Sequence, residues 1–264
     1  MIFIPSRQTV VSSLVSFFCI CGVTILQFQR MQTFGDNKQS VSVAALKKDL
    51  QLEQANLKIL KQAPTFGFDN VIANWAYLGF AQYFGDEEAR SKTGYSLSPE
   101  YFEVILKHDP RFVIAYLALS TSTSMYAGLP ENSVNLTKQG LKHLSPWDPK
   151  NSFYVWRYKA IDELLFLGDS KSAKNSFKSA ADWAKKHPDK ESQESAYISE
   201  RTSNFLSKNP QSKAAQISAW VMVLQNGVDP ETQKRAIKAI ERLGGTVMRT
   251  AEGQNQIKFP QKDS

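Results

Sequence analysis

Apolar residues form one long uninterrupted stretch near the N-terminus of the chain. Residues 9–28 (TVVSSLVSFFCICGVTILQF) contain no charged side chain, and Arg7 and Arg30 stand on either side of them. A helix of about 20 apolar residues spans the hydrocarbon core of a bilayer. The pattern therefore predicts an N-terminal membrane anchor over residues 1–30, with a single transmembrane helix at 9–28.

A cleaved export signal and a buried helix of a soluble protein are the alternatives for this stretch. Such signals usually have a shorter apolar core and small residues at the cleavage site, whereas the residues that follow this stretch read QRMQ. An uncleaved anchor is therefore preferred, which makes the chain a single-pass membrane protein. The side of the membrane on which the remaining chain lies stays open. Basic residues after the stretch favour the cytoplasm, but an N-terminal anchor of this kind often exports the domain behind it.

A polar segment and then a helical segment follow the apolar stretch. Residues 31–42 are polar and contain a Gly-Asp-Asn turn, so they predict a linker. Residues 43–63 predict a juxtamembrane helix with leucines at spacings of four, seven and three, as in a coiled coil: Leu46, Leu50, Leu57 and Leu60. This leucine stripe either packs against the helices that follow or forms the seam of a homodimer through residues 43–62.

Proline punctuates the chain beyond residue 64 at a regular interval. Three prolines are each 39 residues from the next: Pro110, Pro149 and Pro188. A fixed period of this size is the signature of a repeat architecture. Asp109 and Asp148 precede two of these prolines and predict helix starts, because a carboxylate caps free N–H groups and proline needs no donor. With glycines near the middle of each unit, every unit predicts a helix, a turn and a second helix, and one continuous helix is expected over 110–126.

The first and third units carry a family resemblance. Trp75, Leu78 and Gly79 resemble the W-x2-L-G motif of a tetratricopeptide (TPR) first helix, and the Gly-Asp pair at 85–86 resembles the turn of that family. In the third unit three residues have the small–aromatic–small spacing of the second helix of the family: Ala173, Phe177 and Ala180. The period of 39 residues departs from the family's period of about 34, and Gln82 stands where the family has a tyrosine.

The resemblance implies an all-α fold. We expect an α-solenoid of TPR-like helical hairpins over residues 64–252, preceded by one transmembrane helix. Residues 253–264 are polar and predict a flexible tail.

A solenoid of this family is expected to bind a protein or peptide in its concave groove. Four residues are candidates to face that groove: Asn70, Asn74, Tyr83 and Arg157. Asn70 and Asn74 share a helix face, which is either a recognition surface or ordinary solvated surface. Arg157 stands among aromatic residues, where it either holds a carboxylate of the partner or reaches solvent from a core.

Charge and cysteine usage exclude several classes of protein. The formal net charge is +7, but the basic residues are dispersed, so no nucleic-acid partner is expected. Cys19 and Cys21 are the two cysteines, and both lie in the N-terminal apolar stretch. The rest of the chain therefore has no disulfide framework and no cysteine nucleophile.

No catalytic, cofactor-binding or metal-binding residue is predicted. Each of the three histidines follows a lysine and closes a predicted helix, where a cation stabilises the helix dipole: His108, His143 and His187. Their spacing is not that of metal ligands on one helix face. The acidic residues Asp162 and Glu163 are adjacent and so do not share a face. An enzyme is not expected, because no nucleotide-binding or hydrolase motif is present.

Together these patterns predict a membrane-anchored scaffold that binds another protein, with assembly of a membrane complex as the role it fits. Two alternatives stay open. One is a permanent structural subunit of a membrane complex, which would expose a broad apolar patch. The other is an exported cell-envelope protein with a cleaved signal.

Overall fold

A computed structural model describes residues 8, 11, 14–25, 42–209, 212–226, 230–249 and 255–260. Residues 14–25 are helical, but much of the predicted anchor and nearly all of the predicted linker lie outside the described residues. No helix in the described part of the chain is long and apolar enough to cross a membrane. The chain divides into two compact units, residues 1–48 and residues 49–264, and the contacts described below lie within the second unit.

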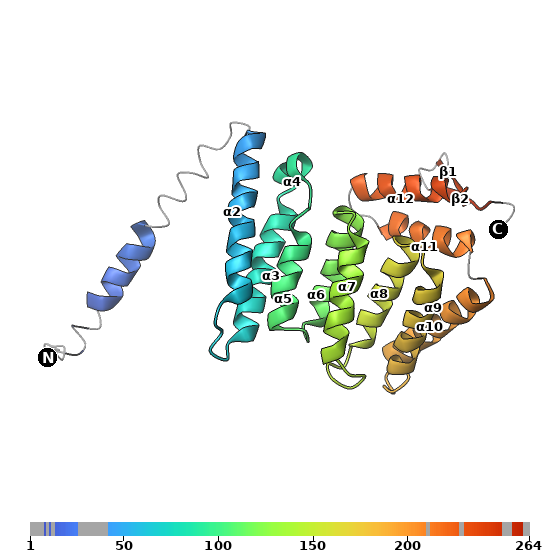
Figure 1. Ribbon diagram of the computed structural model, residues 1–264, viewed down its shortest axis with the longest axis horizontal. Helices are drawn as coiled ribbons and strands as arrows, with labels where there is room; N and C mark the ends of the chain where they lie inside the picture. Colours follow the sequence, from blue (N-terminus) through green and yellow to red (C-terminus); the bar gives the residue numbers. More distant parts are fainter. Residues whose placement is uncertain are drawn as a thin grey trace, which may run out of the picture. The chain divides into compact units, whose positions relative to one another are not determined.

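The described chain is predominantly helical, which confirms the all-α class. The helices are α2 (Val43–Gln62), α3 (Asp69–Gly85), α4 (Glu87–Thr93), α5 (Ser98–His108), α6 (Val113–Leu119), the π-helix η1 (Ser120–Tyr126), α7 (Pro130–Gly140), the 3-10 helix η2 (Leu141–His143), α8 (Phe153–Leu165), α9 (Ser170–Ala184), α10 (Lys190–Lys208), α11 (Lys213–Asn226) and α12 (Pro230–Arg242). Two short strands follow them, β1 (Thr246–Arg249) and β2 (Asn255–Lys258). Figure 1 shows α3, α5, α6, α7 and α8 following one another in chain order, with α11 and α12 lying across one end of the later helices.

Each helix of the second unit packs mainly on helices that are close to it in the chain. Helix α3 packs on α5, α7 on α8, α8 on α9, and α9 on α10, while α11 packs on α12. The side chains between α2 and α7 form one aromatic core, in which Tyr101, Phe102 and Tyr116 are almost fully buried. A second core joins α8 and α9 to α11 and α12 around Ile217 and Ile240.

Capping aspartates explain several of the helix starts. Asp86, Asp169 and Asp189 each accept a hydrogen bond from the backbone N–H three residues later, at 3.0 Å, as N-cap side chains do. The predicted starts at Asp109 and Asp148 differ from the structure. The chain makes a turn after each of them, and α6 and α8 begin only at Val113 and Phe153.

The predicted helix over 110–126 is also not continuous. Helix α6 ends at Leu119, and the hydroxyl-rich residues that follow form the wider π-helix η1. Three consecutive side chains of η1 are nevertheless buried: Ser122, Thr123 and Ser124. The carbonyl groups of Met125 and Tyr126, at the end of η1, accept hydrogen bonds from Arg235 of α12 at 2.5 and 2.9 Å. Tertiary contacts thus fix a segment whose residue types are poor helix formers.

Three leucines of the predicted stripe in α2 face the core. Leu57 is buried, and Leu50 and Leu60 pack against the aromatic core. Hydrogen bonds from Gln54 to Glu100 and from Tyr101 to Glu53, at 3.3 and 2.7 Å, fix α2 against α5. The structure therefore places these leucines against the helices that follow.

The C-terminal segment differs from the expected flexible tail. Strands β1 and β2 pair antiparallel, with Val247 opposite Ile257. Both of these side chains pack against the core formed by α8, α11 and α12. Burial of this apolar pair explains why residues 255–258 form a strand although their composition is polar.

Candidate functional site

The two predicted groove residues on α3 are exposed. Asn70 and Asn74 both lie at the solvent-facing side of the helix. The opposite side of α3 is buried, through Ala73, Ala76 and Phe80. The two amides are therefore free to meet a partner, as the sequence predicted for a recognition surface or for solvated surface.

Tyr83, the third residue predicted to face the groove, is buried in the aromatic core. Its side chain is only 7% exposed, and its hydroxyl accepts a hydrogen bond from the N–H of Leu97 at 3.1 Å. The guanidinium of Arg90 lies 4.0 Å from the centre of its ring. Burial raises the pKa of the Tyr83 phenol. Tyr83 belongs to the aromatic core because it is on the same helix face as Ala76 and Phe80.

Arg157 lies at the contact between α8 and α10. Its guanidinium donates to the hydroxyl of Ser195 at 3.4 Å and stands 5.7 Å from the ring of Tyr154. The Tyr154 hydroxyl donates in turn to Glu191 at 2.7 Å. Arg157 thus joins two helices of the chain, and the structure does not bring it together with the α3 asparagines.

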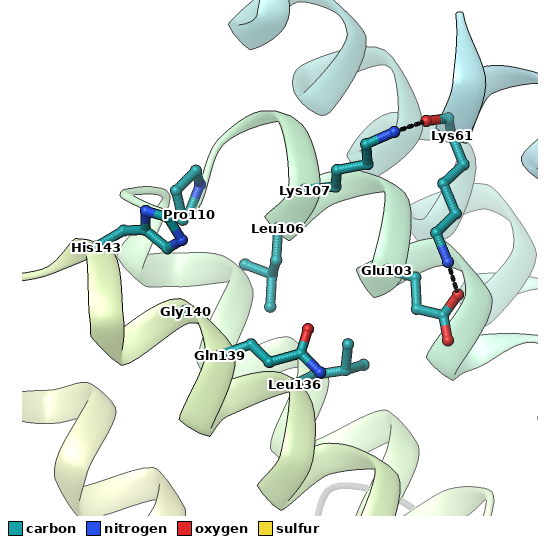
Figure 2. A pocket seen from close by; sticks show the side chains of 9 residues that line it. All are labelled: Lys61, Glu103, Leu106, Lys107, Pro110, Leu136, Gln139, Gly140 and His143. Atoms are coloured by element: carbon teal, nitrogen blue, oxygen red, sulfur yellow. Dashed lines mark hydrogen bonds and ion pairs between the residues drawn. The ribbon is translucent and has the colours of Figure 1, made fainter.

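A pocket of about 430 Å³ opens between α2, α5 and α7 (Figure 2). Its lining residues come from the C-terminal end of α2, from α5 and the turn after it, and from α7 and η2: Lys61, Glu103, Leu106, Lys107, Pro110, Leu136, Gln139, Gly140 and His143. Leu106 is buried and Leu136 is half-buried, so the pocket has an apolar floor. The polar residues surround this floor.

The charges around the pocket are mostly basic. Lys61 forms an ion pair with Glu103 at 2.5 Å, and Lys107 donates to the backbone carbonyl of Lys61. His143 and Gln139 are exposed, and no hydrogen bond joins their side chains to another described residue. Two lysines against one glutamate give the pocket a net positive charge, which attracts a carboxylate because protonated amines donate charge-assisted hydrogen bonds.

Close packing behind the pocket fixes its wall. The hydroxyl of Tyr116 donates to the carbonyl of Pro110 at 2.6 Å, and a Cβ placed on Gly140 would stand 1.8 Å from that hydroxyl oxygen. Burial raises the pKa of Tyr116, so this hydroxyl remains a donor. Only glycine at position 140 allows α7 to approach Tyr116 so closely.

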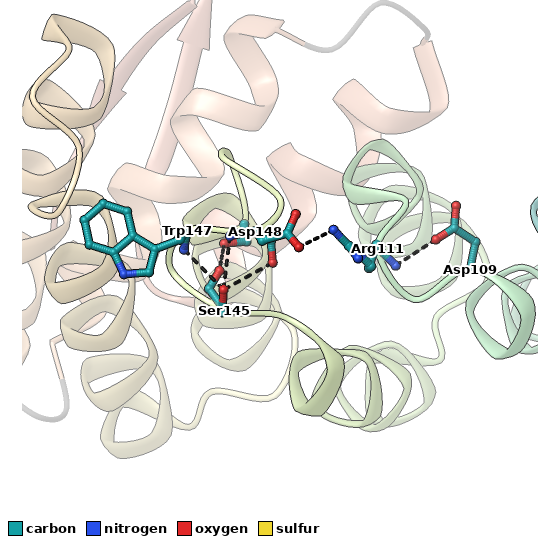
Figure 3. Close-up of polar contacts among 6 residues, drawn as sticks. Asp109, Arg111, Ser145, Trp147 and Asp148 are labelled. Carbon is teal, nitrogen blue, oxygen red and sulfur yellow. Dashed lines mark hydrogen bonds and ion pairs between the residues drawn. The ribbon is translucent and has the colours of Figure 1, made fainter.

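Polar contacts also join two turns at the ends of the hairpins (Figure 3). The Arg111 guanidinium forms an ion pair with Asp148, and the Arg111 N–H donates to Asp109 at 3.0 Å. Ser145 accepts from the N–H groups of Trp147 and Asp148 at 3.3 and 3.1 Å. Because the charged side chains are more than half exposed, this arrangement orders the turns but does not enclose a ligand.

Two adjacent acids of α8 are buried in separate places. Asp162 is fully buried and accepts hydrogen bonds from Ser120 and Ser133, at 2.6 Å each. Burial raises the pKa of Asp162 to about 6, and the serine hydroxyls partly oppose this shift.

Glu163 faces the other side of α8. It accepts from Ser176 at 2.6 Å and pairs with Lys159. The two carboxylates therefore do not share a substrate-sized space. Among the residues that the structure describes, no group of three or more His, Cys, Asp or Glu side chains is placed to hold a metal ion.

No protein-family model, curated protein or solved structure gives a significant match to the chain. The pocket of Figure 2 was not found from the sequence, because its basic residues come from three helices that only the fold brings together. The available signal was the Lys-His pair at 107–108 and again at 142–143. The sequence predicts a helix-end role for this pair. In the structure the ring nitrogens of His108 contact Asp69 of α3 and the carbonyl of Leu60 of α2 at 3.2 Å, so this histidine joins α5 to two other helices.

Proposed function

We propose that this protein is a membrane-anchored scaffold that binds an acidic segment of another protein in the pocket between α2, α5 and α7. The single observation that carries the proposal is the combination of Lys107, His143 and the free amide of Gln139 around a floor of Leu106 and Leu136. Such a pocket fits a short peptide segment in which an acidic side chain stands beside an apolar one.

The rest of the molecule supports a scaffold of TPR-like hairpins. Several hydrogen bonds and ion pairs join residues 37–42 positions apart: Arg111 with Asp148, Tyr154 with Glu191, Arg157 with Ser195, and Ser120 with Asp162. Contacts at this separation match the 39-residue spacing of the prolines and are what stacked repeats would make. The proposed anchor at residues 9–28 would hold the pocket near the bilayer and raise its effective concentration for membrane proteins.

A site-specific cross-link tests the proposal in the full-length chain. A photo-cross-linking amino acid replaces Gln139, which lines the pocket, and in a control protein it replaces Lys171, an exposed residue of α9 away from the pocket. Both proteins are irradiated in native membranes, and the attached peptides are identified by mass spectrometry. The expected result is a protein that is attached at position 139 but not at position 171, through a segment that contains Asp or Glu.

A charge reversal completes this test. We expect Lys107→Glu to reduce the yield of the cross-link at position 139 by at least about fivefold, because the introduced carboxylate repels the carboxylate of the partner. The matched control is Lys138→Glu, an exposed lysine of α7 that does not line the pocket, and it should leave the cross-link unchanged. Equal cross-linking at positions 139 and 171, or equal effects of the two charge reversals, would contradict the proposal.

A further inference from the structure

The outer side of α3 exposes an apolar stripe that no described helix within residues 49–264 covers. Val71, Trp75 and Leu78 are 57%, 68% and 60% exposed, and their spacing of four and three residues places them on one helix face. The turn that precedes the helix adds Phe66 and Phe68, which are 86% and 64% exposed. These five residues are called the α3 face below.

The α3 face is large for the surface of a monomer. A fully exposed aromatic side chain presents roughly 150–250 Å², so its three rings alone expose on the order of 400 Å². The largest apolar patch on a typical monomer is about 300–600 Å² and is often functional. With Val71 and Leu78 added, the α3 face approaches the roughly 800 Å² that each partner buries in a stable interface.

The position of α3 explains why this side is uncovered. Helix α3 packs on α5, and Tyr77 contacts Phe112 at the start of α6, with ring centres 4.9 Å apart. Later helices have packing neighbours on both sides, as α8 has in α7 and α9. At the other end of the unit, α12 and the strands cover the second core.

The charge pattern indicates what covers the α3 face. From residue 70 to residue 85 the helix has no charged side chain. Helices that lie on a bilayer surface pair their apolar side with Lys and Arg, so the α3 face lacks the features of a lipid-binding surface. An uncharged partner helix fits better, and the amides of Asn70, Asn74 and Gln82 beside the stripe can form hydrogen bonds with it.

The spacing of the stripe fits a second copy of the same helix. Trp75 lies near the middle, with Val71 four residues before it and Leu78 three residues after it. If two α3 helices pair antiparallel about a two-fold axis near Trp75, Val71 of one copy meets Leu78 of the other. A two-fold interface uses the same patch on both subunits, and this uncharged patch avoids repulsion between two chains that each carry a net charge of +7.

We propose that the protein forms a homodimer through antiparallel pairing of the α3 faces of two copies. This dimer differs from the one that the leucine stripe of α2 predicted, because Leu50, Leu57 and Leu60 pack on the core of their own chain. It does not depend on the pocket of Figure 2, whose lining contains no residue of α3.

Co-purification of two differently tagged full-length copies tests the proposal. Both copies are expressed together, one tag is captured from gently solubilised membranes, and the amount of the second tag is measured. We expect clear capture for the natural sequence and a reduction of roughly tenfold or more for Trp75→Glu, as is typical when a central aromatic anchor is removed. Ile114→Glu is the matched control, since Ile114 of α6 is 65% exposed, and it should leave the capture unchanged.

The test requires variants that remain folded. Trp75 is exposed, so Trp75→Glu should retain the helical circular dichroism and melting temperature of the natural protein. If it does not, Leu78→Glu takes its place. The proposal is overturned if the natural chains are not captured together, or if the variant is captured as well as the control. Loss of a different stoichiometric protein from the variant, without self-capture by the natural chain, would identify the α3 face as a contact with another subunit.

Disulfide formation tests the antiparallel register. Cys19→Ser and Cys21→Ser first remove the natural thiols, and Val71→Cys is placed in one tagged copy and Leu78→Cys in the other. Under mild oxidation we expect the mixed 71–78 disulfide to form faster than the 71–71 and 78–78 disulfides. Equal rates for the three products would contradict antiparallel pairing.

Discussion

Gly140 lies directly against the hydroxyl of Tyr116, with only 1.8 Å between that oxygen and the position of a Cβ on the glycine. Atoms cannot approach this closely, so α7 can take its place beside α6 only because residue 140 has no side chain. The same contact forms the wall of the pocket through the hydrogen bond from Tyr116 to Pro110.

The first prediction concerns this glycine. Gly140→Ala should lower the free energy of unfolding by about 1–3 kcal/mol, because overpacking against Tyr116 outweighs the higher helix propensity of alanine. Chemical denaturation of the full chain measures the change. Gly85→Ala is the control, since a Cβ at Gly85 meets nothing within 4 Å, and a similar loss of stability there would show that steric overlap is not the cause.

The second prediction tests whether Tyr83 stabilises the core or contacts a partner in a groove. Tyr83→Phe removes the acceptor of the Leu97 N–H and leaves this buried donor unpaired, at a cost of about 1–3 kcal/mol of stability. The cross-linking of a partner at Gln139 should not change, because the Tyr83 ring is buried in the core. Unaltered stability together with weaker partner binding would instead indicate that Tyr83 contacts the partner in a groove.

The third prediction concerns the pH dependence of stability. The pKa of Asp162 is raised from 3.8 to about 6 in the folded protein. Between these two values the folded state binds a proton that the unfolded state does not bind, so stability should increase as the pH falls through 6 towards 4. For a group with this pKa the contribution is on the order of 3 kcal/mol.

Substitution isolates this contribution from that of other titrating groups. Asp162→Asn removes the carboxyl group, so the difference in unfolding free energy between variant and natural protein should depend on pH between about 4 and 6. Asp182→Asn, at an exposed site on α9, should give a much smaller dependence in this range. If the two variants depend on pH alike, the carboxyl group of Asp162 does not titrate near 6.

The fourth prediction concerns the ion pair that links two turns in Figure 3. The Arg111 and Asp148 side chains are 55% and 61% exposed, so solvent screens their attraction. A double-mutant cycle with Arg111→Ala and Asp148→Ala should give a coupling of about 0.2–1 kcal/mol that decreases in high salt. A coupling above this range, or one that salt does not change, would indicate that the pair is shielded from water.

Local sequence rules predicted the parts of the fold that depend on neighbouring residues. The glycines at 128 and 168 take positive φ angles of 70° and 66°, as expected for breaks between helices. Proline begins α7 at Pro130 and α12 at Pro230, where its fixed φ suits a first helical turn. These signals act within a few residues and need no tertiary partner.

The structure adds most where partners are distant in the chain. Aromatic spacing alone does not tell which side of α3 meets α5, so the burial of Tyr83 could not be predicted from it. The π-helix η1 depends on Asp162, which accepts from Ser120 at a separation of 42 residues. The pocket depends on Lys61, Lys107 and His143 meeting across three helices. Periodicity predicts that a helix has a buried face, but it does not predict which helices meet there.

The separation between bonded residues has a consequence for synthesis of the chain. Contacts such as Arg157 with Ser195 close after fewer than 40 further residues have been added, so each hairpin can fold on the preceding one while translation continues. The bonds from Arg235 to Met125 and Tyr126 span 110 and 109 residues. These two hydrogen bonds to η1 can form only when α12 has left the ribosome. The π-helix therefore reaches its final set of hydrogen bonds late in the synthesis of the molecule.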